Sequence, residues 1–302
     1  MSASEIFSMT IMQGFAGMSL FSVLLLMALG LAIIFGQMGV INMAHGEFMA
    51  LGAYTVYMLS LVAEKFGFIA TYFPLALLVA FVVTFIVGYG LEVILIRHLY
   101  RRPLDTLLAT WGVSLIMQQI FRQAFGAREV SPILPEWLSG SLHLSETIEI
   151  PASGVFVLAL SGLATGLVAI MLYRSSWGLT VRATMQNRVI AGAVGINTAK
   201  VDRMSFAFGC GLAGVAGAAF TTIGSTGPTS GSLYIVDTFL VVVFGGAASL
   251  FGTLASAFTI GQGQSALEFF MTGSMAKVIT LVSVVVILML RPEGLFHIKV
   301  RR

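Results

Sequence analysis

Long apolar runs without alternation constrain the fold of this 302-residue chain more than any other feature. A membrane-spanning helix needs about 20 mainly apolar residues, whereas a membrane β-barrel would show alternating apolar and polar positions. Charged residues make up 10% of the chain, against about 25% in soluble domains. We therefore predict an all-α polytopic membrane protein with about eight transmembrane helices, in a single domain over residues 1–302. The expected spans are Met18–Phe35, Phe48–Val62, Leu75–Ile96, Thr106–Phe125, Val155–Tyr173, Met204–Ile223, Leu233–Ile260 and Val278–Leu290.

Lysine and arginine residues orient the chain, because short cytoplasmic loops carry an excess of them. Three arginines near residue 100 place that loop in the cytoplasm, and the basic C-terminus is expected there as well. The loop 126–151 has one arginine against four glutamates, so it is expected outside together with the N-terminus. This orientation corresponds to a bacterial inner membrane with a periplasmic N-terminus. The basic residues that set it are Arg97, Arg101, Arg102, Arg291, Lys299, Arg301 and Arg302.

The run Leu233–Ile260 is longer than one crossing needs, and Gly245 and Gly246 interrupt it. If all eight runs crossed the membrane, the basic C-terminus would lie outside, against the distribution of basic residues. A re-entrant half-helix over residues 233–246, followed by a separate apolar segment, removes this conflict. Such backbone is tolerated at membrane depth where protein or a watery cavity surrounds it. One long tilted helix is the alternative.

A polar segment, Arg174 to Arg203, separates two apolar runs and is predicted to form the cytoplasmic loop 174–203. It carries five basic residues, opposed only by Asp202. The stretch Thr180 to Val194 is rich in helix formers, and Gly195 would terminate the helix. Asn197, or the threonine after it, is a candidate N-cap for the next span. The segment is therefore expected to hold one short helix at the membrane face.

Two interpretations of that short helix are open. Its small residues Ala191, Gly192 and Ala193 would be exposed and would let it fit into a cleft of a partner protein. Alternatively, the helix lies on the membrane as an amphipathic element bound to anionic lipid.

The stretch Gly36–Gly52 places Asn42, His45 and Glu47 between two apolar runs. Ionisable groups at the membrane are costly and usually face the protein interior or a water-filled cavity. One interpretation is a broken helix or loop that lines a route for a polar solute, and the other is an interfacial turn with hydrated side chains. A metal site is not expected, because residues at positions i and i+2 do not share a helix face.

Asp237 and Gln118 are further candidates. Asp237 would begin the half-helix, where a carboxylate complements the helix dipole, either as a cap or as a solute-binding group. Gln118 belongs to the polar end of its span, which is either simply hydrated or partly turned toward a solute pathway. Glu92 is expected to pair with Arg97 at the membrane surface.

Several functional classes are excluded by what the sequence lacks. It contains no phosphate-binding loop of the GxxxxGK[ST] type, no GxSxG and no HExxH, so neither enzymatic activity nor a cofactor is expected. No basic cluster is interleaved with aromatic residues, so no nucleic-acid partner is expected. The glycines and alanines in Phe206–Gly217 recur at three- and four-residue spacing, which is typical of a helix-packing stripe in lipid.

With these features in place, the sequence resembles the membrane subunits of ATP-binding-cassette importers for branched-chain amino acids. The segments that carry the resemblance are Gly30–Tyr54, Trp177–Asn197, Val241–Ala257 and Arg291–Phe296. Within that family, the segments Leu104–Gln119, Ser232–Gly246 and Gly273–Val278 look most like the urea-import branch. The resemblance therefore implies import of a small polar solute, urea or a short amide, with branched-chain amino acids as the alternative.

The resemblance also implies partners and residue roles. It implies a second related permease subunit, two cytoplasmic ATPase subunits, a periplasmic solute-binding protein and surrounding membrane lipid. Alternating access would be driven by the ATPases through a coupling helix at Arg182–Gly195. The residues it assigns to ATPase coupling are Arg182, Asn187, Arg188, Ala191, Gly192, Gly195 and Asn197. The residues it assigns to the substrate pathway are Asn42, His45, Glu47, Asp237 and Gln118.

Two other classes of function compete with an importer subunit. A passive channel for urea or another small solute would suit a glycine-rich, weakly charged interior. A secondary transporter would use Glu47 or Asp237 as a proton site. The first would work without ATPases, and the second would depend on the proton gradient.

Overall fold

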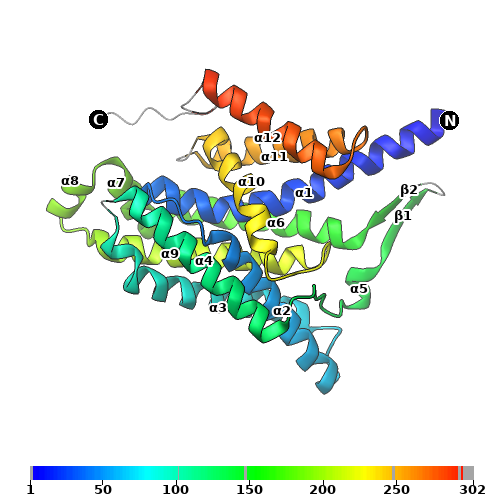
Figure 1. Ribbon diagram of the computed structural model, residues 1–302, viewed down its shortest axis with the longest axis horizontal. Coiled ribbons are helices and arrows are strands. Elements are labelled where there is room, and N and C mark those ends of the chain that lie inside the picture. Colours follow the sequence, from blue (N-terminus) through cyan, green and yellow to red (C-terminus); the bar gives the residue numbers. More distant parts are fainter. Residues whose placement is uncertain (1–2, 101, 146–147, 247–248, 292–293, 295–302) are drawn as a thin grey trace.

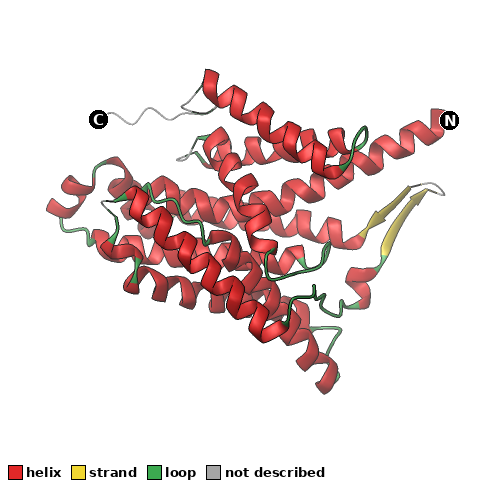
Figure 2. Cartoon of the chain, in the orientation of Figure 1, coloured by secondary structure: helices red, strands yellow, loops and turns green. Residues whose placement is uncertain are grey.

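A computed structural model of the protein describes residues 3–100, 102–145, 148–246, 249–291 and 294. These residues form a helical bundle with one short β-hairpin (Figures 1 and 2). The long helices are α1 (Ala3–Met38), α2 (His45–Phe66), α3 (Tyr72–Ile94), α4 (Pro103–Phe125), α6 (Ala152–Arg174), α9 (Thr198–Phe220), α10 (Ser230–Gly245), α11 (Leu250–Glu268) and α12 (Gly273–Leu290). The shorter elements are η1 (Ile96–His98), α5 (Glu136–Ser139), β1 (Ser141–Ser145), β2 (Ile148–Pro151), α7 (Ser176–Gln186) and α8 (Arg188–Ala193).

Six helices in the described residues are long and apolar enough to cross a membrane, namely α1, α2, α3, α6, α9 and α12. This confirms the all-α polytopic membrane fold. Two further helices, α4 and α11, are long enough to cross but are more polar, and α10 is apolar but has 16 residues. The expected number of eight spans is not confirmed by this set.

The apolar run from Leu233 to Ile260 is divided into two helices, so the alternative of one long tilted helix is wrong. The first, α10, ends at Gly245, and Gly246 follows with φ of +91°, a conformation that glycine adopts without a steric penalty. At about 1.5 Å per residue, α10 is about 24 Å long, shorter than a hydrocarbon core of about 30 Å. Its length agrees with a re-entrant half-helix, and its depth in the membrane stays a prediction.

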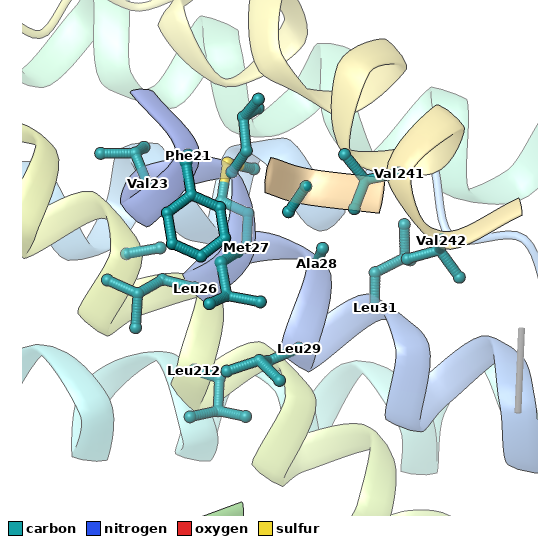
Figure 3. Packing of buried hydrophobic residues seen from close by; sticks show 14 of the residues in the cluster. Phe21, Val23, Leu26, Met27, Ala28, Leu29, Leu31, Leu212, Val241 and Val242 are labelled. Carbon is teal, nitrogen blue, oxygen red and sulfur yellow. The ribbon is translucent and has the colours of Figure 1, made fainter. Parts of the chain in front are cut away.

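The main hydrophobic core surrounds α1. Figure 3 shows side chains of α1, among them Phe21 and Leu29, in one cluster with Leu212 of α9 and with Val241 and Val242 of α10. On its other sides α1 packs against α11 and α6, and α12 lies outside α11 at the edge of the bundle (Figure 1). The end of α1 and the start of α2 are thereby held inside the bundle.

Glycines bring α9 into backbone contact with its neighbours. A Cβ atom on Gly52 of α2 would overlap the backbone of Gly214 in α9, and one on Gly217 would overlap the carbonyl oxygen of Met49. Small residues allow such close approach between helices in lipid, where dispersion contacts rather than the hydrophobic effect favour association. The small-residue stripe predicted in this part of α9 is confirmed as a packing surface.

The segment 126–151, expected as an external loop, contains α5 and the antiparallel hairpin of β1 and β2. Two hydrogen bonds hold this segment against the start of α3 and the turn before it. Tyr72 Oη donates to the Ile133 carbonyl at 2.8 Å, and Trp137 Nε1 donates to the Ala70 carbonyl at 2.9 Å. The hairpin and the start of α1 lie at one end of the molecule, and α8 lies at the other (Figure 1). The basic tail with Lys299, Arg301 and Arg302 is outside the described residues.

We expect Gly52→Ala to destabilise the fold, because the added methyl group would force α2 away from α9. The cost of such overpacking is about 1–3 kcal/mol, against a gain of about 1 kcal/mol in helix propensity. Gly166→Ala in α6 is the matched control, since no atom lies within 4 Å of its added Cβ. Thermal unfolding of the purified variants in detergent should show a lower midpoint for Gly52→Ala and an unchanged or higher one for Gly166→Ala. Equal midpoints would contradict the packing role.

Candidate functional site

The turn between α1 and α2 buries the polar residues that its sequence contains. Gly39 has φ of +64°, and the Oδ1 atom of Asn42 accepts a hydrogen bond from the Ala44 amide at 3.1 Å, directly before α2 begins. Asn42, His45 and Glu47 are all buried. The interpretation of this stretch as a hydrated interfacial turn is therefore wrong. The polar side chains instead face the protein interior, as expected for ionisable groups at membrane depth.

His45 fixes the start of α2 against α1. Its Nε2 atom lies 3.2 Å from the Met27 carbonyl oxygen, and because a carbonyl only accepts, Nε2 carries the hydrogen. Its Nδ1 atom is buried without a hydrogen-bond partner in the described chain. Within the described residues, no group of three or more histidine, cysteine, aspartate or glutamate side chains could hold a metal ion.

Glu47 and Gln118 are separate candidates in the sequence, and the fold brings their side chains into contact. The Oε1 atom of Glu47 accepts hydrogen bonds from Gln118 Nε2 at 2.8 Å and from Ser114 Oγ at 3.1 Å. Its Oε2 atom is buried and has no partner in the described residues. Gln118 is therefore turned inward, whereas its neighbours Gln119 and Arg122 are exposed, as a hydrated helix end requires.

Ser114 belongs to a polar stripe along α4 that the sequence analysis missed. Thr106, Thr110, Ser114 and Gln118 recur at four-residue intervals, which places them along one helix face. The first three are buried, and Thr110 Oγ1 accepts a hydrogen bond from the Met43 amide at 3.1 Å. The four-residue spacing was the signal in the sequence that could have identified this face of α4.

Asp237 neither caps a helix nor joins this cluster. It lies in the interior of α10, which begins at Ser230, so the expectation of a capping role is wrong. Its Oδ2 atom is 2.7 Å from Lys277 Nζ, and that ammonium also donates to the Leu233 carbonyl at 2.9 Å. The Lys277 ammonium lies 5.4 Å from the centre of the Tyr234 ring as well. Asp237 thus connects α10 to α12 through an ion pair whose carboxylate is buried and whose ammonium is partly exposed.

The single helix expected over Thr180–Val194 is wrong, because the chain breaks at Asn187. The Asn187 Oδ1 atom accepts hydrogen bonds from the amides of Val189 and Ile190, both at 3.0 Å, and so caps a separate helix, α8. An asparagine cap competes with continued helix in this way. Gly195, with φ of +91°, terminates α8 as expected.

Arg182 in α7 and Asn197 after α8 both have partners close by in the sequence. The Arg182 guanidinium lies 5.6 Å from the centre of the Tyr173 ring. Asn197 is the N-cap of α9, as predicted, because its Oδ1 atom accepts from the Lys200 amide at 3.0 Å.

The predicted exposure of the small residues in α8 is correct for two of the three. Gly192 and Ala193 are exposed, but Ala191 is buried because α8 folds back against α7 and α9. A substitution at Gly192 therefore changes the outer surface of α8, whereas one at Ala191 changes the contact with the bundle.

Arg188, the first residue of α8, ties this helix to the membrane helices. Its guanidinium pairs with the carboxylate of Asp202 in α9, which is fully buried. The other oxygen of Asp202 accepts from Gln37 Nε2, near the end of α1, at 3.1 Å. The Arg188 guanidinium also lies 5.5 Å from the centre of the Tyr100 ring. These contacts join α8 to α9 and, through Asp202, to α1.

Tyr100 extends this network to Glu92 in α3. The Tyr100 hydroxyl donates to Glu92 Oε1, and Arg203 Nε of α9 lies 4.0 Å from Glu92 Oε2. Burial raises the pKa of the Tyr100 phenol well above its usual value, so the phenol stays protonated and remains a donor. Arg203, and not the expected Arg97, lies within ion-pair distance of Glu92, although Arg97 still acts on this carboxylate electrostatically. The helix α3 ends at Ile94, and Arg97 belongs to the turn η1 that follows.

Comparisons with known proteins identify relatives over nearly the whole chain. The family model for the branched-chain amino acid transport system / permease component matches residues 14–290. The high-affinity branched-chain amino acid transport system permease protein LivH of Salmonella typhimurium is 25% identical over 300 residues, covering 97% of both chains. The probable branched-chain amino acid transport permease protein LivH of Methanocaldococcus jannaschii is 28% identical, covering 91% of this chain and 88% of its own length.

A third relative is the high-affinity branched-chain amino acid transport system permease protein BraD of Pseudomonas aeruginosa, 24% identical over 92% of this chain and 93% of its own length. No solved structure matches the chain. The relatives are transport permease subunits rather than enzymes, in agreement with the absence of catalytic motifs in the sequence.

A double-mutant cycle tests the link between α8 and α9. We expect Arg188→Ala and Asp202→Asn to show a coupling energy of about 1–3 kcal/mol, because one partner is fully buried. The measurement is amide hydrogen exchange in α8, compared among the wild type, the two single variants and the double variant. The exposed pair Arg102 and Asp105, 3.5 Å apart, is the control; its cycle, measured by exchange in α4, should give less than about 1 kcal/mol. Equal coupling in the two cycles would contradict the proposed link.

Proposed function

The chain belongs to the branched-chain amino acid transport system permease family, and from that premise we propose that it is one membrane subunit of an ATP-driven importer. The whole of residues 1–302 would form the permease domain, with the segment 174–203 in the cytoplasm and the segment 126–151 outside. The opposite positions of α8 and the β-hairpin along the long axis support this orientation (Figure 1). The N-terminus would then be periplasmic and the C-terminus cytoplasmic.

The proposed solute is a branched-chain amino acid. The relatives from Salmonella, Methanocaldococcus and Pseudomonas are all named for branched-chain amino acid transport. Urea or a short amide, which the sequence favoured through the resemblance to one branch, has no support from these relatives. The alternative that the sequence left open is therefore the better one.

The exposed apolar surface formed by α8 and its C-cap residue supports the proposal of an importer subunit most directly. Val189, Ile190 and Val194 are 81%, 60% and 72% exposed, in a segment that is otherwise rich in basic residues. An apolar group of this kind on a short, firmly attached helix is typical of a protein docking surface. We assign it to one of two partner ATPases, with a second permease subunit and a solute-binding protein completing the transporter.

A membrane-lipid role for α8 is less consistent with its contacts. Binding to anionic lipid would need free basic side chains beside the apolar ones. Arg188 is instead paired with Asp202, and the Arg182 guanidinium lies against Tyr173. Two of the basic side chains in this segment are thus already engaged within the protein.

The contacts suggest how a movement of the ATPases would reach the solute route. Displacement of α8 acts on α9 through Arg188 and Asp202, and α9 packs on α1, α2 and α3 through its glycine contacts. The helix α2 carries Glu47, whose carboxylate is bonded to α4. Alternating access would then consist of a change in the packing of α2 against α4.

We expect Gly192→Trp to give an assembled transporter whose ATPases no longer respond to the permease. The bulky ring would fill the outer surface of α8, where no atom lies within 4 Å of an added Cβ, without disturbing the fold. The measurement is ATP hydrolysis by the reconstituted complex, with and without the solute-binding protein. Gly162→Trp, on an open face of α6, is the control and should retain stimulation. Normal stimulation in Gly192→Trp would remove α8 from this role.

The substrate is tested by comparing leucine, urea and a short amide at equal concentrations in ATP-driven uptake by the complete complex. Preferential uptake of leucine is expected. Uptake of urea with no uptake of leucine would place the chain in the urea branch. Uptake that persists without ATP and collapses with the proton gradient would instead indicate a secondary transporter.

A further inference from the structure

The described residues bury four carboxylates, and three of them have a cationic partner. Asp202 pairs with Arg188, Asp237 pairs with Lys277, and Arg203 lies 4.0 Å from Glu92. The fourth, Glu47, is 1% exposed and has no lysine, arginine or histidine within ion-pair distance in the described chain. Its hydrogen-bond donors are the neutral groups of Ser114 and Gln118.

This arrangement leaves one defined acceptor position unused. Ser114 and Gln118 both donate to the Oε1 atom of Glu47, which fixes the orientation of the carboxylate. The Oε2 atom is buried with no hydrogen-bond partner, and the hydroxyl of Tyr54 is in the same condition. Tyr54 lies seven residues after Glu47 in α2, two helical turns further along the same face.

Aromatic rings lie next to these polar atoms. The Tyr54 ring stacks on Phe125 of α4 with centroids 4.2 Å apart, and the Phe121 centroid lies at 5.0 Å. The contact between α2 and α4 therefore contains a carboxylate and, two turns away, a packed aromatic cluster.

The electrostatics of the site require a positive charge or a proton. Taking an ionised carboxylate out of water is costly unless a cation or a proton compensates it. Neutral donors orient such a group and stabilise it in part, but they do not balance its charge. The three other buried carboxylates meet this requirement within the chain, and Glu47 does not.

We infer that Glu47 receives the ammonium group of the amino acid in transit, with Gln118 and Ser114 as positioning residues that leave its Oε2 atom free. This inference rests on the proposed function and specifies which group of that solute the protein binds, namely its positively charged amino group. Urea, which is neutral, does not compensate the carboxylate. The site is closed in this structure, so access requires α4 to separate from α2.

The test uses the complete reconstituted transporter with leucine as the probe. Glutamine resembles a protonated glutamate in both shape and neutrality. The variant Glu47→Gln therefore distinguishes compensation by a proton, which it mimics, from compensation by the solute's ammonium group, which it abolishes. We expect Glu47→Gln to lower ATP-driven leucine uptake roughly tenfold or more, as for loss of one partner of a buried charge pair. Glu47→Asp should retain part of the uptake. Glu64→Gln, an exposed glutamate on the same helix, should change nothing.

The positioning residues provide a second test that does not depend on the stability of the Glu47 variants. Gln118→Leu should raise the KM for leucine severalfold with little change in the maximal rate. Gln119→Leu, at the exposed neighbouring position, should leave both unchanged. A structural role alone would lower the amount of folded transporter without this selective change in KM.

The outcomes are distinct from those that test the proposed function. Wild-type leucine uptake in Glu47→Gln would overturn the inference, since a protonated or purely structural Glu47 tolerates this change. A normal KM in Gln118→Leu would overturn the assigned positioning. Failure of the wild-type complex to import leucine with ATP would contradict the proposed function itself.

Discussion

The close approach of α9 to α1, α2 and α3 is the contact on which the other features depend. Without a hydrophobic driving force between helices in lipid, association relies on close packing and on bonds between polar groups. At Gly52, Gly214 and Gly217 there is no room for a single added carbon atom. This packing holds α2 against α9, and the backbone contact of Gly46 with Gly231 holds the start of α2 against α10. Asn42, His45 and Glu47 are buried between these helices.

The buried carboxylates differ in whether the chain itself supplies a cationic partner. Toward α8, the carboxylates of Asp202 and Glu92 are matched by arginines, and the network joins the segment 174–203 to α1, α3 and α9. Between α2 and α4, the carboxylate of Glu47 lacks such a match in the described residues. A buried carboxylate with a cationic partner in the chain suits a rigid connection between helices. A buried carboxylate without such a partner suits a position that a charged solute occupies during transport.

Much of the fold could be predicted from the sequence, because apolar length and glycine position are local properties. The division of the run 233–260 at Gly245 and the small-residue stripe of α9 are examples. Pairings across the fold could not be predicted in this way. Asp237 bonds to a lysine 40 positions away, and Glu47 to a glutamine 71 positions away, and neither spacing has a sequence signature.

The break at Asn187 in the segment 174–203 shows a second reason why sequence-based prediction fails. Helix formers on both sides of Asn187 favour one continuous helix. Local helix propensity does not take account of contacts with distant parts of the chain. In the folded protein the Asn187 cap redirects the chain, and the next residue, Arg188, reaches Asp202. A cap and an ion pair together override the propensity of the flanking residues. The exposed face of α8 is a consequence of that turn.

In the proposed transporter, this chain moves solute only when partner ATPases act on it. The most direct measurement is leucine uptake into proteoliposomes that contain either the chain alone or the chain with its partner subunits, each with and without ATP. We expect uptake above background only for the complete complex with ATP. Uptake by the chain alone at the same rate, without ATP, would contradict this expectation and would identify a passive channel.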